Sequence, residues 1–232
     1  MRGAASMVLL GLSLVSVSLG EGLQSPVGGS DPVPTRVLLI GASVGKAWDF
    51  PGLPDRTGLD GYLCEYVGRS AFDKGPLLRR VLAREVDRPD IIILKECAAY
   101  FPGDLETYRN LVIGWIDACI ESGVMPVPAT VLPVAAPQTI QKKLRRLVRT
   151  HLLGRRDRTE EIARYNDWLK EYTDARGLEI IDLESIVRVS ASDRSLRKDL
   201  HSGDGLHLNE RAYTILDGAA LDLLSRLERR EG

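Results

Sequence analysis

The sequence has few cysteines, few aromatic residues and no excess of charge of either sign. Its three cysteines include no C-x-x-C pair, which argues against a disulfide scaffold and against a structural zinc site. Cys64 and Cys119 are expected to be buried, with one bridge among Cys64, Cys97 and Cys119 as the alternative. A net charge of −1 gives no reason to expect nucleic acid as a partner. With 44% hydrophobic and 27% charged residues, the chain is predicted to be globular.

After the first twenty residues there is no second long apolar run, so no membrane-spanning helix is expected in the rest of the chain. Arg2, the apolar stretch that follows it, and the small residues Ser18 and Gly20 are typical of a secretory signal peptide over residues 1–20. Residues 21–35, rich in proline and glycine, are interpreted as a linker, and residues 36–232 as the folded domain. The protein is therefore expected to be exported, as a secreted or periplasmic protein; a retained N-terminal anchor is the alternative.

From residue 36 onward, short apolar runs alternate with segments of helical spacing. Strands are predicted at residues 37–40, 62–67, 91–94, 124–131 and 178–182, and helices at 76–86, 105–122, 158–176 and from Asn209 to about Arg229. This alternation is typical of a three-layer α/β/α sandwich with a mostly parallel sheet, here of about five strands. Such sheets bind their substrates at the carboxyl ends of the strands. The segments that directly follow the strands are therefore the candidates for a functional site.

Two short segments carry residues suited to nucleophilic catalysis. Ser43 follows the first strand within Gly41-Ala-Ser-Val-Gly45, a tight turn whose backbone N–H groups can stabilise a developing oxyanion. Asp204 and His207 lie three residues apart in a glycine-containing loop before the last helix. An imidazole can take the proton of a serine hydroxyl, and a carboxylate can hold that imidazole in one tautomer. Taken singly, a helix-capping serine and a solvated loop histidine are the simpler interpretations.

Together, the serine after the first strand and the D-x-x-H loop before the last helix resemble the SGNH/GDSL hydrolases over about residues 36–224. The resemblance implies a flavodoxin-like sandwich and an esterase with Ser43 as nucleophile and Asp204 and His207 as its partners. It also implies an oxyanion hole that uses the N–H groups of Ser43 and Gly68, the glycine after the second strand. No metal or cofactor is expected on this reading, and the expected partner is a small-molecule, glycan or lipid ester.

The sequence departs from the family pattern in two places. The family's G-D-S reads Gly41-Ala42-Ser43 here, and the missing aspartate is not one of the three reacting residues. The family's G-x-N-D reads Lys95-Glu96-Cys97-Ala98, so that Cys97 stands where an oxyanion-binding asparagine belongs. A thiol is a weak donor, and losing one oxyanion donor can cost about 10²–10³ in rate. Lys95 and nearby N–H groups are the candidate substitutes; a degenerate hydrolase fold that binds an acylated ligand is the alternative function.

Two other interpretations fit some of the same residues. Gly41-x-Ser43-x-Gly45 also matches the nucleophile elbow of the α/β-hydrolases, but that elbow comes later in the sheet. His201, Asp204 and His207 offer nitrogen and oxygen donors for a metal ion, yet no H-E-x-x-H motif accompanies them and Ser43 would have no role.

Clues to the substrate are few. Trp48, Lys95 and Tyr100 lie at or just beyond strand ends and are predicted to contact substrate. Residues 142–158 combine many lysines and arginines with leucines at near-helical spacing, which predicts a solvated basic helix or peripheral contact with an anionic membrane surface. The sequence does not choose among acyl groups, alcohols or oligomeric states.

Overall fold

The computed structural model describes residues 33–137, 140, 141, 144, 148 and 156–231. The expected signal peptide and nearly all of the expected linker lie outside these residues, as does most of the basic segment 142–158. The first strand, β1 (Thr35–Gly41), begins one residue before the predicted start of the domain. Within the described part of the chain, no helix is both long enough and apolar enough to cross a membrane.

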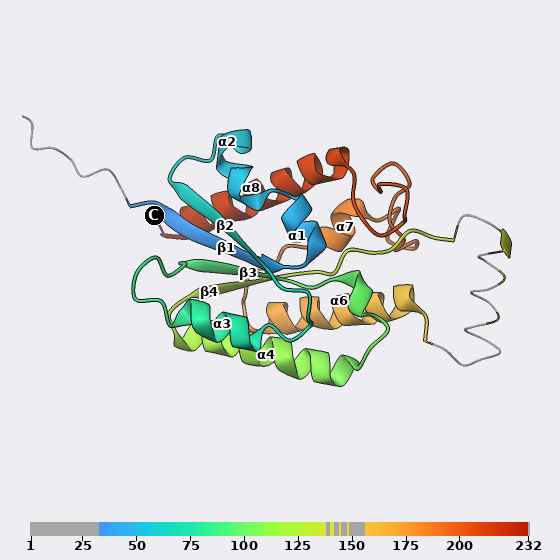
Figure 1. Ribbon diagram of the computed structural model, residues 1–232, viewed down its shortest axis with the longest axis horizontal. Coiled ribbons are helices and arrows are strands. Elements are labelled where there is room, and N and C mark those ends of the chain that lie inside the picture. The colour runs from blue at the N-terminus through green and yellow to red at the C-terminus, as the bar shows by residue number, and fades with distance from the viewer. Residues whose placement is uncertain (1–32, 138–139, 142–143, 145–147, 149–155, 232) are drawn as a thin grey trace, which may run out of the picture. The chain divides into compact units, whose positions relative to one another are not determined.

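Four parallel strands form the central sheet, in the order β2-β1-β3-β4. They are β1, β2 (Tyr62–Gly68), β3 (Ile91–Lys95) and β4 (Met125–Ala129). One face is covered by α3 (Gly75–Leu82), α4 (Leu105–Glu121) and α6 (Arg158–Ala175). The other is covered by α1 (Ser43–Ala47), α2 (Leu53–Thr57), α7 (Leu183–Val187) and α8 (Glu210–Glu231) (Figure 1). The predicted three-layer α/β/α sandwich is confirmed.

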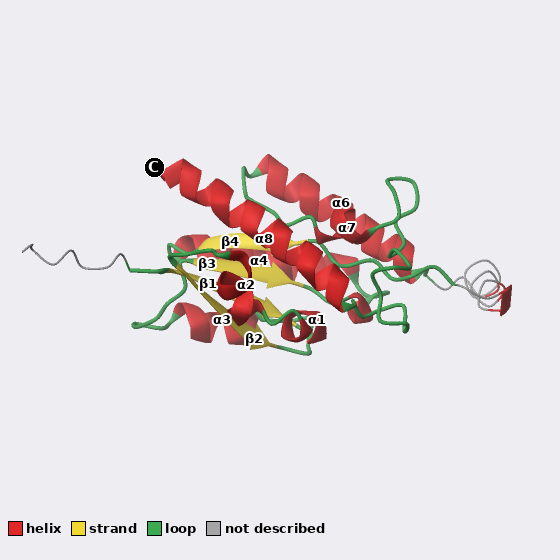
Figure 2. Cartoon of the chain, turned by 90° about the horizontal axis from the view of Figure 1, so that it is seen from above, coloured by secondary structure: helices red, strands yellow, loops and turns green. Residues whose placement is uncertain are grey.

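The strands are apolar along their length because helices bury both faces of the sheet. In β1, Val37 and Leu39 belong to the core cluster on the α8 side, while Leu38 and Ile40 belong to the cluster on the α4 side. All four side chains are fully buried. Figure 2, seen from the α8 side, shows this long helix lying across the strands. The sheet is thus a rigid platform that holds its carboxyl edge in place.

The segment Leu178–Asp182, predicted as a fifth strand, makes only a single bridge to β4. Its two backbone bonds to the sheet run from Thr130 N–H to Ile181 O and from Ile181 N–H to Pro128 O. Since backbone groups alternate along a strand, this edge of β4 carries the nitrogens of every second residue, and the two before Thr130 are Pro128 and Pro126. Proline has no N–H to donate, so the ladder stops after one bridge and the sheet has four strands.

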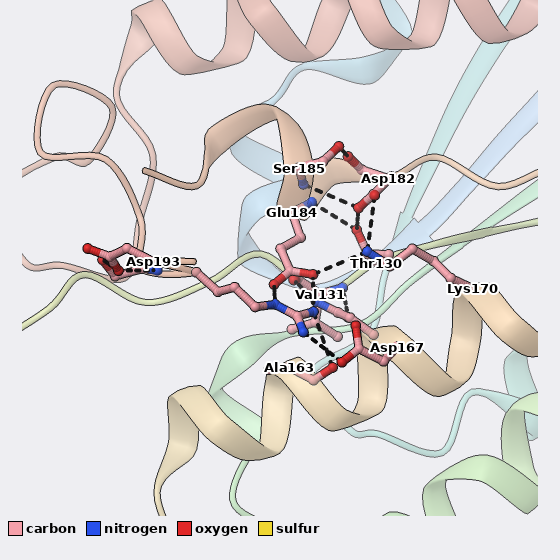
Figure 3. Close-up of polar contacts among 12 residues, drawn as sticks. Thr130, Val131, Ala163, Asp167, Lys170, Asp182, Glu184, Ser185 and Asp193 are labelled. Atoms are coloured by element: carbon pink, nitrogen blue, oxygen red, sulfur yellow. Dashed lines mark hydrogen bonds and ion pairs between the residues drawn. The ribbon is translucent and has the colours of Figure 1, made fainter. Parts of the chain in front are cut away.

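A buried carboxylate network joins the end of β4 to the helices beside it (Figure 3). Glu184 of α7 is 1% exposed and accepts two hydrogen bonds from the Arg194 guanidinium, which also donates to Asp167 of α6. Asp182, ahead of α7, accepts a hydrogen bond from the hydroxyl of Thr130, the residue after β4. These contacts fix the course of the chain where it leaves the sheet.

Candidate functional site

The turn that carries Ser43 lies at the carboxyl end of β1. Ala42 has an extended backbone, and Ser43 is the first residue of α1. Gly45 packs so closely on Tyr66 of β2 that a Cβ at this glycine would lie 2.7 Å from a ring carbon. The Tyr66 hydroxyl donates to the carbonyl of Ala42 at 2.9 Å. The neighbouring strand therefore fixes the turn, a contact that the sequence pattern did not predict.

The loop that carries Asp204 and His207 is tightly folded before α8. Gly203 and Gly205 adopt positive φ angles of 109° and 77°, which glycine tolerates and which let the loop turn back on itself. The carbonyl of Gly205 accepts a hydrogen bond of 2.9 Å from the backbone N–H of Ala135, in the segment that follows β4. The loop is therefore attached to the sheet by way of that segment.

Ser43, His207 and Asp204 form a chain of hydrogen bonds. Ser43 Oγ lies 3.3 Å from His207 Nε2, and His207 Nδ1 lies 2.5 Å from Asp204 Oδ2. The second oxygen of Asp204 accepts from the backbone N–H groups of Leu206 and His207, each at 2.8 Å. The hydrogen bond from His207, with these two N–H groups, lowers the pKa of Asp204 well below its usual range. An ionised Asp204 keeps the ring proton on Nδ1 and leaves the Nε2 lone pair facing the serine.

The site is open to solvent on one side and lined by a small hollow on the other. The side chains of Asp204 and His207 are 49% and 42% exposed, so a substrate can reach them. The free volume of the hollow is about 10 Å³, far below the roughly 300–1,000 Å³ of most ligand pockets. It is lined by Ser43, Val44, Lys95, Cys97, Ala98, Leu132, Leu206 and His207. Leu132 and Leu206 were not among the predicted site residues.

Lys95 and Glu96 are both buried, which excludes a surface ion pair at the sheet edge. Lys95 is 1% exposed, and its ammonium donates to the backbone carbonyl of Glu96 at 3.1 Å. The Glu96 carboxylate points to the opposite face of the sheet and pairs with Lys74 at 2.6 Å. Burial raises the pKa of Glu96 to about 7, against the lowering effect of Lys74. The two neighbouring residues thus serve different layers of the molecule.

Cys97 lines the hollow at the position where the family has its asparagine. Its sulfur accepts a hydrogen bond of 3.5 Å from Ala99 N–H at the start of a short 3₁₀ turn, Ala98–Tyr100. Cys64, Cys97 and Cys119 are all unpaired thiols, and all are buried. Gly68 ends β2 beside Gly41 but does not line the hollow, so its role as an oxyanion donor stays a prediction.

The structure places Trp48 and Tyr100 away from the hollow. Trp48 is 2% exposed, packs edge-on against Phe50, and donates its indole N–H to Asp217 of α8 at 2.7 Å. Tyr100 donates its hydroxyl to the carbonyl of Arg69 and lies against Phe72. Nothing in the structure supports their predicted contact with substrate; both act in packing. Of the three predicted substrate contacts, only Lys95 lines the hollow.

The metal interpretation finds no support among the described residues, which include no group of three His, Cys, Asp or Glu side chains placed to hold an ion. His201 instead accepts a hydrogen bond of 2.9 Å from Gly203 N–H through its Nδ1. Asp204 and His207 are engaged with each other and with Ser43.

No family model matches the chain, and no curated protein sequence matches it. Solved structures do. A GDSL-like lipase from Bacteroides thetaiotaomicron aligns with a TM-score of 0.60 over 85% of this chain and 89% of its own, at 15% identity. An esterase from a Pseudoalteromonas species, inhibited by monoethylphosphonate, aligns at 0.54 over 84% and 99%, with 12% identity. An acetylxylan esterase from Geobacillus stearothermophilus aligns at 0.52 over 82% and 95%, with 11% identity.

At such low identity the likeness lies in the backbone. The features shared with these enzymes are therefore those of the fold: the parallel sheet and the helical layers on its two faces. On that architecture, the chain has the fold of the SGNH/GDSL hydrolases.

Proposed function

We propose that this protein is a serine hydrolase that cleaves a carboxylic ester. One observation carries the proposal: the unbroken line of hydrogen bonds from Ser43 Oγ through the His207 imidazole to the Asp204 carboxylate. A hydroxyl is a poor nucleophile until a base takes its proton, and this line supplies both the base and the group that orients it. The similarity to solved lipases and esterases supports the same reaction class.

The proposed reaction has two steps. His207 Nε2 takes the proton of Ser43 as the oxygen attacks the ester carbonyl, and the backbone N–H groups of Ser43 and Gly68 donate to the oxyanion. Collapse of this intermediate releases the alcohol, which takes the proton from His207, and leaves an acyl group on Ser43. His207 then takes a proton from water, which attacks the acyl group; the bond to Ser43 Oγ breaks, His207 returns the proton to Oγ, and the acid is released. Asp204 stabilises the imidazolium that forms in each step.

The proposed substrate carries a short acyl group. The hollow beside Ser43 is small, and Leu132 and Leu206 are among its walls, so an acetyl group suits it better than a long chain. The alcohol would extend toward solvent on the exposed side of His207, where a sugar, a lipid or a small molecule fits equally. We expect kcat/KM to fall as the acyl chain of 4-nitrophenyl esters grows from acetyl to octanoyl; a rise with chain length would contradict this choice.

Substitution of the three residues tests the proposed chemistry. Ser43→Ala and His207→Ala should each lower the hydrolysis of 4-nitrophenyl acetate by at least about 10³-fold, and Asp204→Asn by about 10²–10⁴-fold, without unfolding the protein. A phosphonate directed at serine should label wild type but not Ser43→Ala. Ser192→Ala removes an exposed hydroxyl elsewhere and is the matched control. Hydrolysis by Ser43→Ala at the wild-type rate would refute the proposal.

A degenerate fold that binds an acylated ligand is the second candidate, because Cys97 replaces the oxyanion-binding asparagine of the family. The same experiment distinguishes the two. A folded wild-type protein that neither hydrolyses esters nor reacts with the phosphonate would favour the binding protein.

A further inference from the structure

A buried ammonium with unused hydrogen-bond donors borders the proposed site. Lys95 is 1% exposed, and its Nζ donates to one acceptor among the described residues, the backbone carbonyl of Glu96. An ammonium has three donors, so two of them have no acceptor in the described part of the chain. Burying a charge in this way is costly unless something else compensates it. An anion that enters the hollow would supply that compensation.

The position of Lys95 in the sheet directs its ammonium toward Ser43. Side chains alternate along β3, so Lys95 continues the row of Ile91 and Ile93 on the face that α1 and α8 cover. Gly41 lies beside it on β1, and a Cβ there would meet the Lys95 stem at 3.7 to 3.9 Å. The stem therefore runs past the turn of Ser43. The head reaches the carbonyl that joins Glu96 to Cys97, beside the place of the missing asparagine.

Lys74 shows what a structural lysine looks like in this molecule. It is also fully buried, but its ammonium pairs with the Glu96 carboxylate and reaches the carbonyls of Ala71 and Phe72. It also lies 5.5 to 5.8 Å from three aromatic ring centres. The charge of Lys74 is therefore compensated by a carboxylate, by carbonyl oxygens and by aromatic rings. Lys74 does not line the hollow. Among the residues that the structure describes, Lys95 has neither a carboxylate partner nor an aromatic ring around its ammonium.

We propose that Lys95 is a catalytic residue whose ammonium donates to the oxyanion, in place of the asparagine that Cys97 replaces. The inference rests on the proposed function. When Ser43 Oγ bonds to the carbonyl carbon and its proton passes to His207, the π electrons of the carbonyl move to its oxygen. That oxygen faces the free donors of Lys95, and the full positive charge makes this contact stronger than one to a neutral amide. No proton of Lys95 is consumed in the step.

The surroundings of Lys95 give its contribution a pH dependence. Burial lowers the pKa of Lys95 to about 8; Cys97 and Glu96 oppose this effect, and Lys74 adds to it. His207 lines the same hollow, and on β2 the Tyr66 hydroxyl donates to the carbonyl of Ala42. Lys95 should therefore be charged at neutral pH and lose its charge above about pH 8, so kcat/KM of wild type should fall on the alkaline side.

Lys95→Met tests the proposal, because methionine keeps much of the stem and removes the charge. We expect kcat for 4-nitrophenyl acetate to fall by about 10²–10³-fold with little change in KM, and the alkaline decline near pH 8 to disappear. Lys46→Met is the matched control: Lys46 is also in reach of Ser43 along the chain, but it is exposed on α1 and outside the hollow. The control should keep both the wild-type rate and the alkaline decline.

Each outcome decides one of the two proposals. If Ser43→Ala is inactive while Lys95→Met keeps wild-type kcat and the wild-type pH profile, the role of Lys95 is refuted and the hydrolase stands. If Ser43→Ala is as active as wild type, the hydrolase itself is refuted. Should Lys95→Met not fold, the wild-type profile decides alone, and a flat kcat/KM between pH 7 and 9.5 would overturn the role of Lys95.

Discussion

Gly45 is a single residue whose missing side chain sets the position of the serine beside it. The Tyr66 ring occupies the space that a Cβ would need, and Leu39 lies on the same side at 3.4 Å. The same ring carries the hydroxyl that holds the Ala42 carbonyl. A larger residue at position 45 would have to displace the ring, and with it the turn that presents Ser43.

Gly45→Ala should therefore lower both stability and turnover. Overpacking typically costs about 1–3 kcal/mol, and moving Ser43 Oγ from its 3.3 Å contact with His207 slows proton transfer. Gly218→Ala is the matched control, since nothing lies within 4 Å of a Cβ at that position in α8; it should gain about 0.5–1 kcal/mol. Thermal melts and esterase rates measure both effects. A Gly45→Ala protein with wild-type melting temperature and turnover would contradict this account.

The site was predictable where the information is local. Asp204 and His207 lie three residues apart in one loop, so their spacing alone suggested the pairing that the structure forms. Tyr66, Leu132 and Leu206 were missed because their roles depend on strand register and on packing between distant segments. Trp48 lies in the core, 2% exposed, and a sequence does not tell an aromatic residue in a pocket from one in the core.

At the scale of elements, the network around Glu184 ties α7, α6 and the end of β4 together (Figure 3). Arg194 contributes a guanidinium that donates to both oxygens of the Glu184 carboxylate, a residue that is 1% exposed. Two residues further on, the backbone N–H of Leu196 donates to Val134, next to the residue that holds the loop of His207. The network thus supports the site from a distance.

Arg194→Met should destabilise the fold by about 3–5 kcal/mol, because it leaves a buried carboxylate without its main partner. Arg197→Met is the control: its partner Asp199 is 42% exposed, and solvent screens this pair, so its loss should leave the urea midpoint nearly unchanged. Urea denaturation of both variants measures the difference. Equal urea midpoints for the two variants would show that the network does not contribute this stability.

Element boundaries were predicted well where apolar periodicity and capping agree. Both ends of four elements lie within two residues of the predicted positions: β1, β3, α4 and α6. The predicted cap of the last helix is also present, since Asn209 accepts a hydrogen bond from Ala212 N–H at the start of α8. The first predicted helix ends early, at Leu82, and Val86 is 75% exposed. Asp87 has a φ of 57° there, because the chain must turn before it enters β3. Periodicity alone does not register such a constraint.

At the scale of the whole domain, its first and last segments are fastened together. Trp48, five residues after Ser43, donates to Asp217 of α8, and Arg56 donates to the second oxygen of the same carboxylate at 3.0 Å. The helix that follows His207 is thus bound to the segment that follows Ser43. Export and membrane contact through residues 142–158 stay predictions.

The buried charge of Lys95 should show in the stability of the whole molecule. A lysine whose pKa falls from 10.5 to about 8 on folding costs about 3 kcal/mol while it is charged in both states. Lys95→Met should therefore be more stable than wild type below pH 8. The difference in the free energy of unfolding between the variant and wild type should shrink between pH 8 and 10.5. In that range Lys95 has lost its proton in the folded protein but still carries it in the unfolded chain. Chemical denaturation at pH 7 and pH 10 measures it; a variant less stable at pH 7 would contradict the prediction.

Among the described residues, one backbone hydrogen bond joins the loop of Asp204 and His207 to the segment after β4, the bond from Ala135 N–H to the carbonyl of Gly205. Asp204 and His207 lie in one short stretch of chain, so any shift of that stretch moves both side chains and keeps them aligned with each other. Motion elsewhere in the molecule therefore leaves the orientation of the imidazole unchanged. What such motion can alter is the distance between Ser43 Oγ and His207 Nε2. A perturbation far from the site would then change how often Ser43 lies within hydrogen-bond distance of His207, and not the alignment of His207 with Asp204.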